Sequence, residues 1–313
     1  MATKRCARAV LVATMVGMGA GFVSSVWGQS QNSAGQAQLV VTANGNKSRL
    51  AQPLSQSDIA VKVKNRPANI VGWALFTGSN DDLQLVLMFD DSSRMYLTQQ
   101  IPALRKFIEA LPPSAAVGIA YMQYGNYVMA RPMTTDHVLA AKSLRVTLAI
   151  PGISGSPYFC LSQLAKHWPS KEPSSRRVAF MVTNGEDPYY PHHDLQDPYL
   201  RDAIQDTQKA GLLVYTLYFG ENGRMNQGYA GIVIGQNYLL QVATATGGDF
   251  YQLGLGSPVS FEPFLDQFRR SLDNQYLLTL TTPDSGWLNV IVKSKVPGVK
   301  LVAARTIYIA KNK

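Results

Sequence analysis

The sequence predicts an α/β fold, a doubly wound and mostly parallel six-stranded sheet with small β appendages at both ends. Three observations predict it: from about residue 80 to 275 strand-like runs alternate with helix-like segments, the runs are apolar on both faces, and the connections are short. Strands of this kind are covered by helices on both sides of the sheet. The rest of the chain leaves room for a short module before this unit and another after it.

The first 28 residues have the layout of a secretory signal. Lys4, Arg5 and Arg8 precede an apolar run, and the Val-Trp-Gly segment that ends at Gly28 suits cleavage. We therefore expect an exported protein, periplasmic or extracellular. The alternative is an uncleaved membrane anchor, since the run approaches the length that spans a bilayer. Only in that case do we expect association with a membrane.

Charge and cysteine content narrow the functional classes. Cleavage of the signal would remove three of the 29 basic residues and none of the 20 acidic ones, which lowers the net charge from +9 to +6. No run of Lys and Arg is interleaved with aromatic residues, so nucleic acid is not an expected partner. Cys160 would then be the only cysteine. Its place on the apolar face of a helix predicts a buried core residue.

Residues 29–79 are expected to form a disordered lead followed by a small β module. Residues 29–36 are rich in Gln, Ser, Asn and Gly, which favours disorder. Strand-like runs follow at 38–42, 59–63 and 70–75, separated by turn residues.

The central strand of the α/β unit ends abruptly on polar residues. Residues 83–89 are nearly all apolar, and two aspartates and two serines follow them. This end of a parallel strand is the edge at which open α/β sheets bind ligands. A helix over 97–111 and a strand over 116–121 come next. A Tyr-Gly-Asn turn then predicts an antiparallel edge strand over 127–133.

The alternation of helices and strands continues to residue 275. Periodicity and composition predict helices at 138–148, 158–167, 200–210, 237–246 and 261–272, and strands at 177–182 and 212–218. The tail, residues 276–313, breaks the pattern with strand-like segments at 276–281, 287–292 and 301–309. These predict a β meander that packs with the N-terminal module, because each alone has too few strands to be stable.

Three segments of the α/β unit carry a family resemblance. Asp90 and Ser92 form an Asp-x-Ser motif after the apolar strand, with Arg94 two residues on. Ser156 lies in a Gly-Ser-Pro-Tyr turn, and Asn184 ends a strand that reads Val-Thr-Asn-Gly. In this order the segments resemble the metal-ion-dependent adhesion site of von Willebrand factor type A domains, whose fold is Rossmann-like. The family has a serine where Arg94 stands, a threonine at Ser156 and an aspartate at Asn184.

The resemblance implies a hard cation, Mg²⁺ or else Mn²⁺ or Ca²⁺, held near Asp90, Ser92, Ser156 and Asn184. One coordination place would remain for an acidic side chain of a partner. Arg94 removes a hydroxyl ligand, and a guanidinium about 5 Å from a divalent ion is repelled by roughly 6–7 kcal/mol at an effective dielectric of about 20. We therefore expect weak metal binding or none, unless nearby carboxylates compensate for the change.

The same edge of the sheet predicts a protein partner. Arg94 could pair with Asp90 and offer its guanidinium to a carboxylate of that partner. The alternative is that Arg94 is solvated and the site is vestigial. Tyr189 and Tyr190 lie in a long insertion beside the site. Tyrosine is a frequent anchor of protein interfaces, so both could contact the partner. Simple packing of the loop explains them equally well.

Asp91 and Glu186 complete the set of predicted partner-contact residues. We expect an exported protein-binding module, for adhesion or scaffolding, and not an enzyme. The segment Gly-Ile-Ser-Gly-Ser lacks the final glycine of a nucleophile elbow. His192 and His193 lack a third metal ligand at a suitable spacing. An exported hydrolase and a structural component of the envelope stay open as alternatives.

Overall fold

The computed structural model describes residues 35–45, 53–78, 81–93, 95–192, 194, 196–220, 229–252 and 259–310. The signal-like segment 1–28 and the predicted site residue Arg94 lie outside the described residues, as does His193. Within the described ranges, no helix has the length and apolar character needed to cross a membrane.

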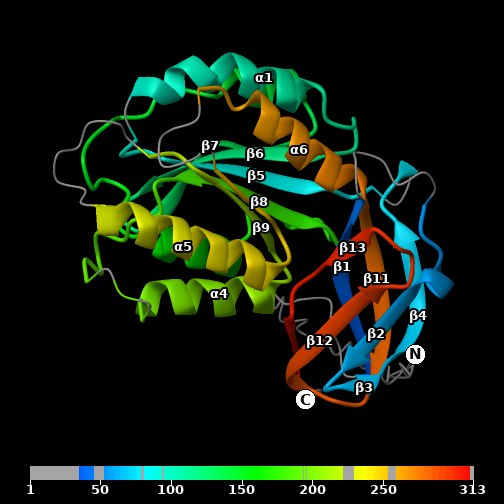
Figure 1. Ribbon diagram of the computed structural model, residues 1–313. Helices are drawn as coiled ribbons and strands as arrows, with labels where there is room; N and C mark the ends of the chain where they lie inside the picture. Colours follow the sequence, from blue (N-terminus) through cyan, green and yellow to red (C-terminus); the bar gives the residue numbers. More distant parts are fainter. Residues whose placement is uncertain are drawn as a thin grey trace, which may run out of the picture.

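A six-stranded mixed sheet forms the centre of the molecule (Figure 1). In spatial order its strands are β10 (Phe250–Tyr251), β9 (Leu213–Tyr218), β8 (Arg177–Thr183), β5 (Gln84–Asp90), β6 (Ala116–Gln123) and β7 (Asn126–Thr134). Neighbours from β10 to β6 run parallel, and β7 runs antiparallel to β6 at the edge, which confirms the antiparallel strand predicted from the turn. The strand order reverses between β5 and β8. Such a switch point is where doubly wound sheets bind ligands.

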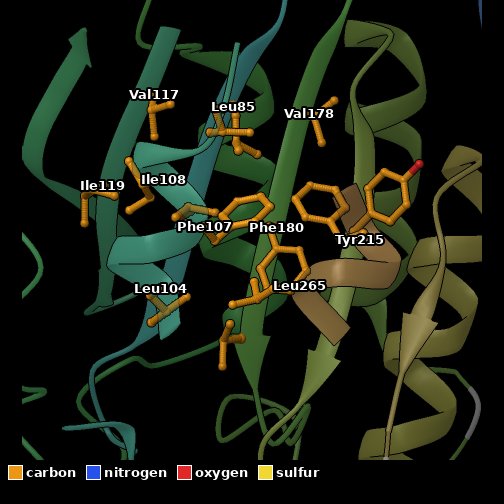
Figure 2. Close-up of a cluster of buried hydrophobic side chains, with 14 of the residues drawn as sticks. Leu85, Leu104, Phe107, Ile108, Val117, Ile119, Val178, Phe180, Tyr215 and Leu265 are labelled. Carbon is orange, nitrogen blue, oxygen red and sulfur yellow. The ribbon is translucent and has the colours of Figure 1, made fainter. Parts of the chain in front are cut away.

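Helices cover both faces of this sheet (Figure 1). One face is covered by α1 (Ile101–Glu109), α2 (His137–Lys142) and α6 (Glu262–Asp273), and the other by α3 (Pro157–Lys166), α4 (Pro198–Ala210) and α5 (Tyr229–Thr246). A 3-10 helix, η3 (Met95–Gln100), leads into α1. Figure 2 shows the first face, where Phe107 and Leu265 meet Phe180 of β8. Every residue of β5 is buried, which explains its nearly continuous apolar sequence.

The helix predicted over 138–148 is wrong in its second half. α2 ends at Lys142, and residues 144–150 have no regular secondary structure. The physical cause is Asp91. Its carboxylate binds the Arg145 side chain and the N–H of Leu148, and its carbonyl accepts from the N–H of Ala149. These bonds hold the backbone away from a helical path.

The segments before and after the α/β unit form one β-sandwich instead of two separate appendages. One sheet has the order β13 (Val299–Val302), β1 (Gly35–Gly45), β11 (Gln275–Thr282) and β4 (Asn69–Leu75). The other has the order β14 (Thr306–Ile309), β12 (Gly286–Ser294), β2 (Ile59–Val63) and β3 (Arg66–Pro67). Apolar side chains of both sheets fill the space between them. The expected packing of the two flanks is confirmed, and it takes the form of strand pairing.

The meander predicted for residues 276–313 is wrong. β11 and β12 lie in different sheets, and the segment predicted at 301–309 divides into β13 and β14, which also lie in different sheets. The reason is the length of β1, which pairs with β11 from Gly35↔Thr282 to Thr42↔Gln275. With β4 on its other edge, β11 has no edge left for β12. β12 therefore lies in the other sheet of the sandwich, where it pairs with β2.

One buried arginine joins the sandwich to the α/β unit. The Arg176 side chain is 3% exposed and lies just before β8. Its Nε donates to Gln275 of β11 at 2.7 Å, its Nη1 to Asp81 at 2.8 Å, and its Nη2 to the carbonyl oxygen of Leu272 in α6. The guanidinium also lies 4.9 Å from the centre of the Phe76 ring. This network fixes the sandwich against the end of the central sheet opposite the predicted site.

Candidate functional site

Asp90, the last residue of β5, lies at the centre of the carboxyl edge of the sheet. Its Oδ1 accepts from the backbone N–H and the hydroxyl of Ser92, at 2.9 and 2.5 Å, and its Oδ2 accepts from the Thr183 hydroxyl at 2.7 Å. Thr183 ends the neighbouring strand β8. Asp90 is 3% exposed, so its carboxylate acts mainly to join the loops after β5 and β8.

Ser156 lies on the other side of this edge, at the start of α3. Its oxygen accepts from the N–H of Phe159 as the helix cap, and its hydroxyl donates to Asp187 at 2.5 Å. The carboxyl group of Asp187 lies near that of Asp197, the cap of α4, whose Oδ2 is buried and accepts no hydrogen bond from the described residues. Both carboxyls are at most 5% exposed. Two carboxylates this close cannot both ionise easily, which favours a proton held between them at pH values below about 7.

Burial raises the pKa of Asp187 to about 7, and the charge of Asp197 adds to this, although the hydrogen bond from Ser156 opposes it. Burial also raises the pKa of Asp197, against the N–H groups that it caps. Because the folded state then binds a proton that the unfolded chain releases near pH 4, stability should fall as pH rises from about 4 to 7.

Asp187→Asn should remove much of this pH dependence, since the amide keeps an acceptor for Ser156 without ionising. We expect the melting temperature of the natural protein to fall between pH 5 and pH 7.5, and that of the variant to fall less. Asp202→Asn is the matched control, because Asp202 is exposed on α4. An unchanged pH dependence in Asp187→Asn would contradict the shared-proton arrangement.

The loop after β8 is fixed against α5 by a close approach of backbones. Gly185 has φ of 73°, and a Cβ there would lie 2.3 Å from the carbonyl oxygen of Gly235 in α5. Only glycine fits both requirements. The Asn184 Oδ1 accepts from the N–H of Glu186 at 3.1 Å, so this side chain is used within its own loop. Both Asn184 and Glu186 are half-buried.

Asp91 is fully buried and binds Arg145, which sequence reasoning missed. The two guanidinium N–H groups reach the two carboxylate oxygens at 2.8 and 2.7 Å, and Gln123 and the N–H of Leu148 also donate to them. Burial alone would raise the pKa of Asp91, but these donors outweigh it and hold the pKa below its usual range. The guanidinium lies 3.7 Å from the centre of the Tyr121 ring. Asp91 thus positions a loop and is not itself exposed to a partner.

This loop presents three aliphatic side chains to solvent. Val146, Leu148 and Ile150 are 43%, 49% and 51% exposed, and we call them the apolar ridge. Thr147, between the first two, is buried and donates to the carbonyl oxygen of Ser93 at 2.6 Å. The alternation of residues facing inward and outward was a signal for an extended segment that the helix prediction overlooked.

Aromatic residues continue the exposed surface beside the ridge. Tyr124, in the β6–β7 turn, is 77% exposed, and its N–H donates to the carbonyl oxygen of Ile153. Tyr189 is 46% exposed, and its ring lies over Gly155 and edge-on to Tyr199 at 5.8 Å. The structure therefore brings Tyr189 to the site.

Other candidates from the sequence lie in different environments. Tyr190 turns toward His192, with ring centres 4.7 Å apart, and its hydroxyl donates to Asp194 at 3.2 Å. Cys160 is fully buried, as predicted, and burial raises the pKa of its thiol.

The site's oxygens bind one another in a way that leaves few for a metal ion. Both Asp90 oxygens accept hydrogen bonds from hydroxyl groups. The Ser156 hydroxyl donates to Asp187, and its oxygen accepts from the N–H of Phe159 at the start of α3. In the ranges that the structure describes, no three His, Cys, Asp or Glu side chains gather closely enough to hold a metal. A hard cation takes about six oxygen ligands, so an ion bound here would have to displace several of these hydrogen bonds.

The strand order, the antiparallel edge strand and the polar loops at one edge give the molecule a von Willebrand type A-like fold, as the resemblance implied. No protein-family model matches the chain, and no curated protein matches its sequence.

Solved structures with a similar fold include a conserved hypothetical protein, BatB, from Bacteroides thetaiotaomicron, at 13% identity and a TM-score of 0.45. An aerotolerance-related membrane protein from Bacteroides fragilis matches at 13% identity and a TM-score of 0.43. Each match covers 61% of this chain and 98% of the other. The VWA domain of Rpn10 matches at 10% identity and a TM-score of 0.40, over 61% of this chain and 97% of that domain.

Proposed function

We propose that this chain is an exported protein-binding module, for adhesion or scaffolding, which binds a partner through the carboxyl edge of its mostly parallel sheet. The observation that carries the proposal is the apolar ridge of Val146, Leu148 and Ile150, exposed beside the switch point of the sheet. Single exposed aliphatic residues are ordinary on protein surfaces, whereas grouped ones mark interaction sites. Export rests on the signal-like layout of residues 1–28.

The ridge is held in place before any partner arrives. Asp91 fixes its backbone through Leu148 and Ala149, and Thr147 fixes it through Ser93. A surface ordered in advance loses little conformational entropy on binding, which favours affinity. The partner that suits it has an apolar contact patch. An acidic side chain of that partner would meet Arg94, whose role stays a prediction.

We propose further that binding depends weakly on metal or not at all. The mutual hydrogen bonds of Asp90, Ser92 and Thr183 support this, as does the amide at Asn184 in place of a carboxylate. Calorimetric titration with Mg²⁺, Mn²⁺ and Ca²⁺ should give no binding below millimolar concentration. The double variant Arg94→Ser with Asn184→Asp should bind more tightly. Sub-millimolar binding by the natural protein would contradict this proposal.

The hydrolase alternative would need Ser156 as its nucleophile. That side chain is fully buried, and its oxygen both caps α3 and donates to Asp187. This arrangement favours a binding role over an enzymatic one. Turnover of generic esters or peptides by the purified protein, abolished by Ser156→Ala, would overturn the binding proposal.

Photo-crosslinking in the native host tests the proposed surface. A photoreactive amino acid at Leu148 should give a discrete covalent adduct with one other protein, and adding Ile150→Asp should suppress it. The same group at Val138 on α2 is the matched control, since Val138 is 51% exposed outside the ridge. The absence of any adduct at Leu148, or the same adduct from both positions, would refute the proposal.

A further inference from the structure

A cavity of about 700 Å³ lies where the sandwich meets the α/β unit. Its walls come from the C-terminal end of α5, the loop to β10, and the strands β1, β12 and β13. This is within the range of about 300–1,000 Å³ that is typical of ligand sites. It lies on the sandwich side of the molecule, away from the apolar ridge, so a ligand bound here is separate from the partner of the proposed function.

Two strands separate along this cavity and leave an open edge. β12 and β13 leave the same turn and then join different sheets. β12 pairs with β2 through residues 290–294, but β14 covers its other edge only over Gly286–Asn289. Five consecutive residues of β12, 289–293, line the cavity, so the strand presents its backbone there as well as one row of side chains.

The hydrogen-bond pattern shows which backbone groups face the cavity. The carbonyl of Asn289 accepts from Lys64 on the β2 side, and the N–H of Val290 points the opposite way, to Arg305. In an antiparallel strand this direction alternates from residue to residue. The N–H and C=O of Val292, and the N–H of Ser294, therefore point toward the open edge. No strand pairs with this edge among the described residues.

The surroundings of the open edge are positively charged. Lys293, Lys300 and Arg305 are exposed and line the cavity, and no carboxylate of the described residues forms a salt bridge with them. Asp249 is the acidic residue in the lining; burial raises its pKa, and Lys300 opposes this. The cavity thus combines backbone donors and acceptors with an excess of cations.

We propose that this cavity binds an acidic peptide segment in extended conformation, which adds to the open edge of β12 as an extra strand. Backbone hydrogen bonds to Val292 and to the N–H of Ser294 would supply affinity, as in other cases of strand addition. Lys293, Lys300 and Arg305 would select carboxylates on alternate residues of the peptide. At about 3.4 Å per residue, the open edge over residues 291–294 accommodates roughly four residues of the peptide.

Fluorescence anisotropy with a labelled acetyl-Glu-Val-Glu-Val-Glu-amide peptide tests this proposal on the full chain. The acidic peptide should bind, and its Gln-Val and Lys-Val counterparts should bind at least about tenfold more weakly. Lys300→Glu with Arg305→Glu should weaken binding to a similar degree. The matched control is Arg105→Glu with Lys142→Glu, which makes the same charge change on exposed residues of α1 and α2.

Backbone methylation distinguishes strand addition from charge attraction without changing the protein. Two versions of the acidic peptide are compared. One is methylated on the backbone nitrogens of its odd-numbered residues, and the other on those of its even-numbered residues. Because only one edge of an added strand bonds to β12, one methylated peptide should lose binding and the other should retain it. Equal binding by both, competition by free glutamate at similar concentration, or no binding of the acidic peptide would each overturn the proposal.

Discussion

Replacing Arg176 with methionine should lower the free energy of unfolding by about 3–5 kcal/mol, the cost of breaking a buried ion pair from one side. The change would leave the Asp81 carboxylate, the Gln275 amide oxygen and the Leu272 carbonyl without their shared donor. Methionine keeps a long apolar stem, so the loss reports mainly on the polar network. Chemical denaturation followed by circular dichroism measures it.

Arg177→Met is the matched control for this experiment. Arg177 is the next residue in the chain, it is half-buried, and in the described part of the chain its guanidinium has no ion pair and only a distant contact with Trp168, 6.0 Å from the ring centre. We expect its loss to cost less than about 1 kcal/mol. If both variants lose the same stability, the Arg176 network does not join the two parts of the molecule as described.

Asp91→Ala should lower the free energy of unfolding by about 2–4 kcal/mol and release the apolar ridge. The value lies below that for a fully buried pair, because the Arg145 side chain is 36% exposed and can regain water. Hydrogen exchange should accelerate most at the amide of Leu148, which donates to the Asp91 carboxylate, and less at Ala149, which donates to the Asp91 carbonyl that the variant keeps. The ridge would then lose its fixed shape, and partner binding should weaken.

A double-mutant cycle with Arg145→Met separates the pair from the rest of the loop. Strong coupling between the two changes is expected, since the two side chains share two hydrogen bonds. Asp202→Ala, which removes a carboxylate 60% exposed beside Arg201, should cost less than about 1 kcal/mol. Independent effects at Asp91 and Arg145, or unchanged exchange at Leu148, would show that this pair does not hold the loop in place.

Much of the fold could be predicted because its strongest signals are local. The run that became β5 is apolar at nearly every position, and only a strand buried on both faces needs that pattern. The strands that pair with β11 and β12 could not be predicted in the same way. This pairing depends on the length of β1, which is more than two hundred residues away in the chain, and so on competition between distant edges.

The edge of the sheet at which the candidate residues gather could be predicted, but the hydrogen bonds among them could not. The polar ends of β5 and β8 marked the edge, because strand ends in a parallel sheet converge there. The Asp91–Arg145 pair was missed, since a charged residue 54 positions away gives no periodic signal. That pair holds residues 144–148 out of the helix predicted there, an example of a tertiary contact that decides local structure.

The affinity between this protein and the partner captured at Leu148 shows whether the apolar ridge is the partner surface. Titration calorimetry would compare the natural protein, Leu148→Asp and the control Val138→Asp, each with and without a chelator. We expect Leu148→Asp to weaken binding by about tenfold or more, and Val138→Asp and the chelator to leave it unchanged. Full affinity in Leu148→Asp, or loss of binding on removing metal, would contradict a partner surface built on the apolar ridge.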